Sequence, residues 1–146
     1  MITRFEKFSL VISELHKQIV RISAEEMRKY GLQGPSARIL LTLLKKGPQT
    51  AAALARNVDK NKAEISRVIV ELEKKGLVEK ADSKTNYRVK IKLTEKGSET
   101  AESIKASAIS AVSHASLGLS DEDREGMYDC LDHIAKNLQT FTPQDL

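Results

Sequence analysis

The clearest pattern of apolar and polar positions in this chain lies between residues 61 and 76. Apolar side chains recur there at helical spacing, at Ile65, Val68, Ile69 and Leu72. Asn61 stands three residues before Glu64, which is the spacing of a capping box, and Gly76 is a typical helix end. The opposite face carries Ala63, Ser66, Arg67 and Val70. The pattern therefore predicts a helix with one buried face and one mostly small face that can enter a groove.

The flanking segments predict what surrounds this helix. Residues 51–56 read as a short helix capped by Thr50, and residues 57–60 connect it to the next helix. After that helix, residues 77–80 read as a strand and residues 82–86 as a turn. Residues 87–93 then alternate between apolar and basic side chains, as in a half-buried strand. Alone, the central helix would suit an all-helical domain, but this order of elements favours a winged helix-turn-helix, which places one helix in the DNA major groove.

The two ends of the chain each predict a long helix with one apolar stripe. The stripes comprise Phe5, Phe8, Ile12, Leu15, Ile19 and Ile22 in the first helix, and Met127, Leu131, Ile134, Leu138 and Phe141 in the last. Steps of three and four residues are typical of helices that pack along their lengths. We expect a dimer interface that includes Phe5, Phe8, Ile12, Leu131, Ile134 and Leu138. The alternative is that these stripes cover a monomer's own core.

The expected fold class is mainly α (α+β). It is a winged helix-turn-helix with a two-stranded wing, flanked by N- and C-terminal dimerisation helices. Residues 1–146 form one domain in this interpretation, with residues 35–93 as the winged helix-turn-helix and residues 1–30 and 94–141 as the helical dimerisation part. A long helix from Thr94 to about Leu117 connects the wing to the last helix, which Ser120 caps.

Charge is unevenly distributed, although the net charge is only +4. Residues 54–92 hold eleven Lys and Arg against six Asp and Glu, whereas residues 120–146 hold two against seven. A basic surface on the winged unit supplies the salt-dependent part of DNA affinity. Aromatic residues make up 4% of the chain and Trp is absent, so we expect a core of aliphatic side chains.

Residues that carry chemistry are sparse. Cys130 is the single cysteine, which agrees with a reducing cytoplasm, and His16, His114 and His133 lie far apart in the sequence. The sequence holds no phosphate-binding loop, nucleophile elbow or paired-carboxylate motif. There is no signal peptide pattern and no apolar run long enough to span a membrane. We therefore expect a cytoplasmic protein that is not an enzyme and has no metal site or cofactor.

Several short motifs in this order resemble the multiple-antibiotic-resistance regulator (MarR) family of transcription factors. They are Leu54–Ala55, Ala63–Arg67, Leu72–Val78 and Leu93–Gly97. The family usually has a double arginine in the wing, whereas this chain reads Lys-Thr-Asn-Tyr-Arg at residues 84–88. The resemblance implies a homodimeric regulator, most often a repressor at a pseudo-palindromic operator. It also implies a small aromatic or phenolic effector bound near His16, Tyr30 and Arg38.

The predicted DNA-binding residues lie on the central helix and the wing. On the helix they are Lys60, Asn61, Lys62, Ala63, Ser66, Arg67 and Val70, and on the wing they are Lys84 and Arg88. Arg67 is the expected base reader, because arginine can donate two hydrogen bonds to guanine, while Lys60 and Lys62 are expected on phosphate. Two alternatives remain open: a redox- or metal-responsive regulator of the same fold, and a winged-helix module that binds protein.

Overall fold

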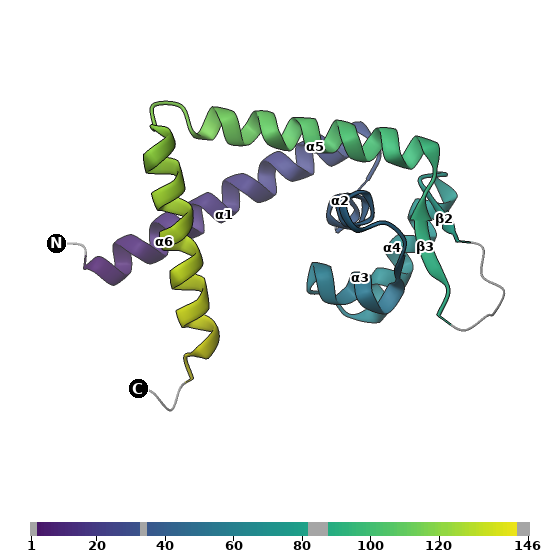
Figure 1. Cartoon of the computed structure of the whole chain (residues 1–146), viewed down its shortest axis with the longest axis horizontal. Helices are drawn as coiled ribbons and strands as arrows, with labels where there is room; N and C mark the ends of the chain where they lie inside the picture. The colour runs from purple at the N-terminus through teal and green to yellow at the C-terminus, as the bar shows by residue number, and fades with distance from the viewer. Residues whose placement is uncertain (1–2, 33–34, 82–87, 143–146) are drawn as a thin grey trace. The chain divides into compact units, whose positions relative to one another are not determined.

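The computed structural model describes residues 3–32, 35–81 and 88–142, apart from the side chain of Phe5. Its elements are α1 (Arg4–Lys29), α2 (Ser36–Lys46), β1 (Gln49–Thr50), α3 (Ala51–Val58), α4 (Lys62–Lys74), β2 (Val78–Lys80), β3 (Lys90–Leu93), α5 (Glu95–Ala115) and α6 (Asp121–Thr140), as Figure 1 shows. The chain divides into two compact units, Met1–Ser107 and Ala108–Leu146, so the division falls within α5. The described part is mainly helical with a small sheet, as the sequence predicted.

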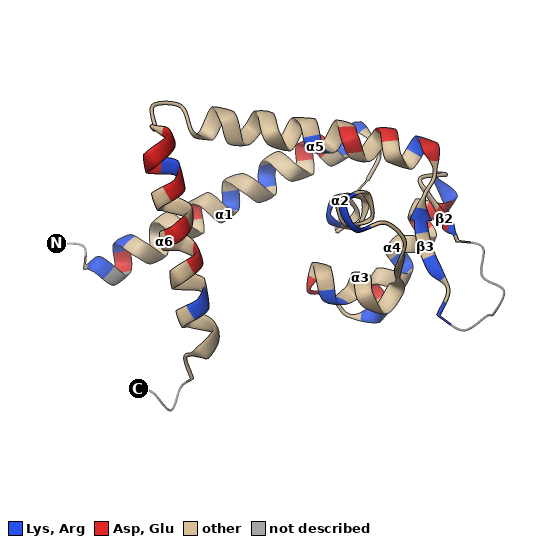
Figure 2. Cartoon of the chain, in the orientation of Figure 1, with Lys and Arg blue, Asp and Glu red and all other residues tan. Residues whose placement is uncertain are grey.

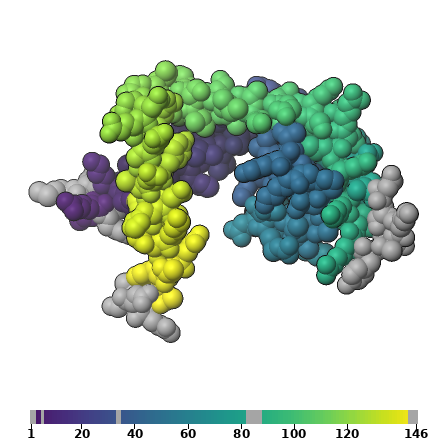
Figure 3. Space-filling model, viewed as in Figure 1, coloured from purple at the N-terminus to yellow at the C-terminus, as the bar shows by residue number. Residues whose placement is uncertain are grey.

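The core of the first unit is aliphatic. Its fully buried large side chains come from the turn after α1 and from α2, α3 and α4, and they are Leu32, Ile39, Leu40, Leu54, Val58, Ile65 and Leu72. Ile91 of β3 and Ala101 and Ile104 of α5 close the same cluster. Burial of each leucine, isoleucine or valine side chain of this cluster contributes about 1.5–3 kcal/mol to the stability of the fold. In Figure 3 the blue and teal atoms of this part of the chain form one continuous surface on the side in view.

Caps fix the ends of the two central helices where the sequence predicted them. The Thr50 hydroxyl accepts from the Ala53 amide at 3.2 Å. The Asn61 side chain accepts from the Glu64 amide at 2.9 Å, and the Glu64 carboxylate accepts from the Asn61 amide at 3.4 Å, which completes the capping box. Helix α3 extends two residues beyond the predicted end, to Val58, and stops because Asp59 takes the left-handed conformation with φ 53°.

The sheet of the first unit has one strand that the sequence pattern did not predict. Its order is β1-β3-β2, and both pairs are antiparallel. Val78 stands opposite Leu93 in the expected pair, whereas Gln49 stands opposite Ile91 in the added pair. β3 begins at Lys90, later than predicted, and Tyr87 lies outside the described residues. A two-residue strand is too short to show an alternating pattern, which is why β1 was missed.

The start of α5 is tied to the end of α4. The Thr94 hydroxyl donates to the Gly76 carbonyl at 2.6 Å and accepts from the Gly97 amide at 3.0 Å. The Lys96 ammonium donates to the Lys75 carbonyl at 3.1 Å. A Cβ on Gly97 would stand 1.8 Å from the carbonyl oxygen of Leu77, so no side chain fits there. The sequence after β3 therefore fixes how α5 leaves the sheet.

A carboxylate links α1 to α5 within the first unit. Glu26 accepts from the Lys29 ammonium at 2.6 Å and from the Ser107 hydroxyl at 2.7 Å. These two hydrogen bonds, that from Lys29 first, lower the pKa of Glu26 below its ordinary value. Glu26 therefore stays ionised at neutral pH and holds the middle of α5 against α1.

The second unit carries α6, which Ser120 caps as predicted. The Ser120 hydroxyl accepts from the Asp123 amide at 3.0 Å, and Asp123 completes a capping box. No residue of α6 is buried. Among the described residues, none of the helices combines the length and apolar character needed to cross a bilayer.

Candidate nucleic-acid interface

The exposed face of α4 is the one predicted from the sequence. Ile65, Ile69 and Leu72 are buried on one side, while the other side exposes Lys62, Ala63, Ser66, Arg67 and Val70. Val70 is 47% exposed although it is apolar. The exposed side chains are short except for Lys62 and Arg67, so another molecule can approach the helix closely along this face.

A basic hollow adjoins this face. Its volume is about 570 Å³, and it is lined by Thr50, Ala51, Ala52, Arg56, Lys62, Arg88 and Val89. Its three cationic side chains, Arg56, Lys62 and Arg88, are exposed and come from α3, α4 and the segment before β3. None of the described residues that line it is acidic. The hollow therefore offers a concave positive surface beside α4, on elements whose basic positions appear in Figure 2.

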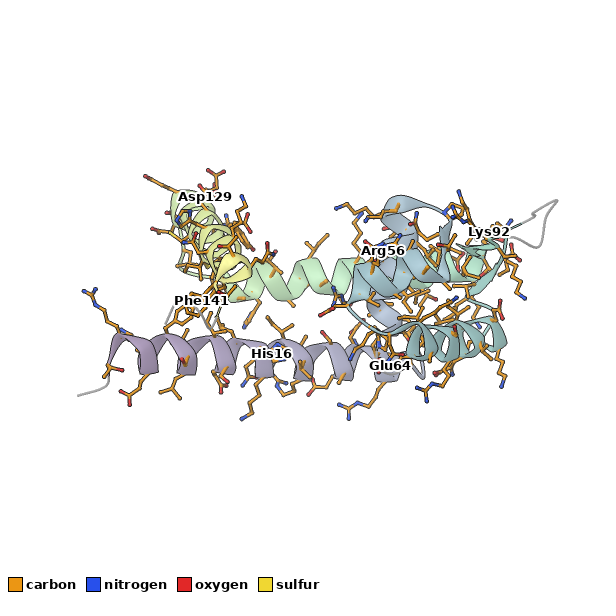
Figure 4. All side chains as sticks on the ribbon, turned by 90° about the horizontal axis from the view of Figure 1, so that it is seen from below. His16, Arg56, Glu64, Lys92, Asp129 and Phe141 are labelled. Atoms are coloured by element: carbon orange, nitrogen blue, oxygen red, sulfur yellow. The ribbon has the colours of Figure 1, made fainter. Side chains whose placement is uncertain are left out.

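The other predicted contact residues have different surroundings. Lys60 is exposed just before α4, whereas the Asn61 side chain is engaged in the capping box described above. Lys84 lies outside the described residues. Arg88 adopts the left-handed conformation with φ 60°. On β3, the Lys92 ammonium lies 3.4 Å from the Glu79 carboxylate, which partly neutralises its charge. Figure 4 labels Arg56 on α3, Glu64 on α4 and Lys92 on β3.

A second, largely apolar cavity lies between α1 and α2 in the first unit. Its volume is about 870 Å³, and its walls are His16, Ile19, Val20, Ser23, Ala24, Met27, Arg28, Gly31, Leu32, Pro35, Ala37 and Arg38. Two of the predicted effector residues, His16 and Arg38, meet there, and none of the described wall residues is acidic. Tyr30 is not in the wall; it packs against the core.

Sequence reasoning missed Arg28 as a wall residue of this cavity. The signal was present, because steps of four residues lead from His16 through Val20 and Ala24 to Arg28, along one face of α1. Arg28 and Arg38 thus both line this largely apolar cavity. This combination suits an anion with an apolar body.

Apolar side chains remain uncovered on the helices predicted to form a dimer. On α1 they are Phe8, Leu10, Val11, Ile12, Leu15, Ile19, Val20 and Ile22, and on α6 they are Met127, Tyr128, Leu131 and Leu138, with Phe141 at its end. Ile134 is half-buried, and the side chain of Phe5 lies outside the described residues. Leu138 is 60% exposed. So much apolar surface on each helix is typical of an interaction face.

Cys130 is exposed on α6, and no group of three or more His, Cys, Asp or Glu in the described part of the chain is placed to hold a metal ion. His16 lies on α1, His114 near the end of α5 and His133 on α6. Cationic side chains gather at the basic hollow and at the α1–α2 cavity.

Comparisons with known proteins agree with this architecture. Residues 27–96 match the family model described as "Sugar-specific transcriptional regulator TrmB", and no curated protein matches the chain. A crystal structure of a MarR family transcription regulator superposes with a TM-score of 0.85 at 18% identity, covering 93% of this chain and 91% of that one.

Two further solved structures have the same fold. A MarR family protein from Bacillus stearothermophilus has a TM-score of 0.73 at 23% identity, covering 93% of this chain and 94% of that one. The S. aureus MepR–DNA complex has a TM-score of 0.76 at 18% identity, covering 90% of this chain and 97% of that one. The resemblance expected from the sequence is thus confirmed in three dimensions: the chain has the winged-helix fold of the MarR-family transcription regulators.

Proposed function

We propose that this protein is a MarR-type transcription regulator that binds DNA sequence-specifically as a homodimer. The observation that carries the proposal is the exposed face of α4 beside a hollow lined by Arg56, Lys62 and Arg88. A protruding helix reads base edges, while flanking cations hold the phosphates on either side. One protein of the same fold, MepR, has been solved in complex with DNA, which supports this use of the fold.

Base reading is assigned to the middle of α4. The Arg67 guanidinium can donate two hydrogen bonds to one guanine in the major groove, an arrangement that distinguishes guanine from the other bases. Ala63 and Ser66 are small and exposed, so the helix can lie deep enough for Arg67 to reach. Val70 offers an apolar contact of the kind that a thymine methyl group accepts.

Phosphate binding is assigned to the basic hollow. Arg56, Lys62 and Arg88 converge there, and Lys60 is exposed two residues before Lys62. Neutralising a phosphate releases counterions, so these contacts supply affinity that falls with salt and does not depend on sequence. In this assignment the hollow positions the duplex, and α4 reads it.

The homodimer is supported by the uncovered apolar stripes of α1 and α6. Burying apolar surface yields about 25 cal/mol per Å², so covering these stripes with a second copy favours association. A two-fold dimer presents its two α4 helices to half-sites about 34–36 Å apart on one side of the duplex. The operator should therefore be a pseudo-palindrome, and a dimer seated on a promoter would act as a repressor.

The α1–α2 cavity supports control by a small aromatic or phenolic anion. Its apolar walls suit an aromatic ring, and His16, Arg28 and Arg38 provide positive or hydrogen-bonding groups. A ligand changes DNA affinity only if it binds the DNA-competent and incompetent states unequally. The protein is in this view an effector-responsive repressor.

The Arg67→Ala variant tests the base-reading assignment. Loss of a bidentate contact should weaken operator binding by about 1–3 kcal/mol and leave binding to random duplex nearly unchanged. The measurement is fluorescence anisotropy with an operator selected from genomic fragments. Lys105→Ala is a charge-matched control, since Lys105 is exposed on α5. An Arg67→Ala variant with the wild-type ratio of operator to random affinity would exclude Arg67 as base reader.

The Lys62→Gln variant tests the phosphate assignment. Removing one phosphate contact should lower the slope of log affinity against log salt by about one unit and weaken operator and random duplex alike. Binding is measured at several salt concentrations, with Lys105→Gln as the control that should keep the wild-type slope. An unchanged slope in Lys62→Gln would remove the hollow from the DNA interface.

A further inference from the structure

Arg38 takes part in two features of the first unit, the α1–α2 cavity and the end of α3. It is a wall residue of the α1–α2 cavity. Its guanidinium also donates to the carboxyl end of α3, with Nη2 3.1 Å from the Asn57 carbonyl oxygen and Nη1 3.3 Å from the Val58 carbonyl oxygen. Arg38 therefore connects the cavity to the first helix of the helix-turn-helix.

The two carbonyls depend on an outside donor. The last carbonyls of a helix lack partners within it, and here the amides of Asp59 and Lys60 both turn back to the Ala55 carbonyl. Arg38 fills this gap from α2. A guanidinium has five N–H groups, so a group in the cavity can begin to bind its remaining donors before these two bonds break.

The carboxyl end of α3 is also the base of the turn that leads into α4. Asp59 takes its left-handed conformation directly after Val58, and α4 begins at Lys62. Val58 and Leu54 of α3 lie in the same buried cluster as Ile65 and Ile69 of α4. A shift at the end of α3 is therefore passed to the helix proposed to read DNA.

We propose that Arg38 is a positioning residue that couples an anion in the α1–α2 cavity to the α3–α4 turn. This inference rests on the proposed function. A carboxylate carries a full negative charge and can accept two parallel hydrogen bonds from a guanidinium, whereas a backbone carbonyl offers only a dipole, so a bound carboxylate draws Arg38 away from the Asn57 and Val58 carbonyls. The turn then loses one of its contacts with α2, and the dimer holds the operator less tightly.

A second contact between α2 and α3 keeps the fold intact when Arg38 leaves the Asn57 and Val58 carbonyls. The Lys46 ammonium of α2 donates to the Asn57 side chain at 2.8 Å, and that side chain donates to the Ala53 carbonyl at 2.9 Å. These bonds do not involve Arg38. Loss of the Arg38 contacts should therefore move the turn without unfolding α3.

The test compares Arg38→Gln with Arg28→Gln, since both remove one positive charge from the same cavity and only the first removes the contacts to α3. Without ligand, Arg38→Gln should bind the operator on the order of tenfold more weakly than wild type. Arg28→Gln should bind like wild type. Arg38→Lys, which keeps the charge and a donor, should recover part of the affinity. Equal operator affinities in Arg38→Gln and Arg28→Gln would overturn the inference.

Benzoate supplies the readout that a merely structural role would not change. Operator affinity of the wild type should fall as benzoate is added, and that of Arg28→Gln should fall too but at higher benzoate concentrations, because Arg28 also lines the cavity. The operator affinity of Arg38→Gln should start low and stay constant. A loss of operator affinity with benzoate that is as large in Arg38→Gln as in the wild type would overturn the coupling. It would also be overturned if calorimetry showed benzoate binding to the wild type while the operator affinity stayed unchanged. If benzoate does not bind, the ligand-free comparison decides. Failure of the proposed function itself is distinct, because the wild type would then not prefer operator to random duplex.

Discussion

Replacing both Leu131 and Leu138 with glutamate is expected to convert the proposed homodimer into monomers. The two leucines lie one heptad apart on the uncovered stripe of α6 and are 38% and 60% exposed. Glutamate at these positions remains in water in the single chain, so the protomer should stay folded. In a two-fold dimer the same carboxylates would be buried without partners, at a cost of several kcal/mol.

The expected rise in the dimer dissociation constant is at least about a thousandfold, measured by sedimentation equilibrium. Operator affinity should fall with it, because a monomer engages one half-site and loses the gain from linking two. The matched control is the His133→Glu, Thr140→Glu double variant. It has the same spacing and places two carboxylates at exposed positions of α6 outside the stripe. A Leu131→Glu, Leu138→Glu protein that remains dimeric would show that α6 does not form the interface.

Replacing Gly97 with alanine is expected to be strongly destabilising. The added Cβ would meet the Leu77 carbonyl oxygen at 1.8 Å and the Leu77 carbonyl carbon at 2.8 Å, so backbone must move to admit it. Overpacking of this kind costs about 1–3 kcal/mol and more when backbone is the obstacle. The movement would also strain the bond from the Thr94 hydroxyl to the Gly76 carbonyl. We expect the loss to reach or exceed about 3 kcal/mol.

Gly126→Ala is the matched control for this substitution. Gly126 is also inside a helix, and a Cβ there would have no neighbour within 4 Å. Alanine should raise the stability of that helix by about 0.5–1 kcal/mol, because glycine loses more backbone entropy on folding. Urea unfolding of the two variants should shift in opposite directions. A Gly97→Ala protein as stable as Gly126→Ala would mean that α5 does not approach Leu77 so closely.

Local patterns in the sequence predicted most of the helix-turn-helix. Caps and apolar spacing are properties of neighbouring residues, so the start of α4 at Lys62 and its buried stripe of Ile65, Ile69 and Leu72 followed from the residues alone. The same holds for the start of α6, where Ser120 forms the predicted cap. Even the missed end of α3 has a local cause, since Asp59 takes a conformation that a non-glycine residue seldom adopts.

Features that depend on distant residues were not predictable. β1 exists because Gln49 and Thr50 pair with Ile91 and Lys90 of β3. A segment of two residues is too short for its sequence to predict such a pairing. The tie from Arg38 to Asn57 and Val58 joins positions about twenty residues apart. The basic hollow is similar, because Arg56, Lys62 and Arg88 converge only once the sheet and helices have packed. Gly97 lies between these cases: its motif was recognised, but its reason appears only beside Leu77.

Binding to an operator tests the central claim most directly. Labelled DNA selected from genomic fragments is titrated with the wild-type protein by fluorescence anisotropy at two salt concentrations, with random duplex as competitor. The proposed function predicts tight binding that weakens with salt and that random duplex does not displace, since α4 reads sequence while the basic hollow holds phosphate. Binding that is weak, equal for both DNAs, or indifferent to salt would contradict it.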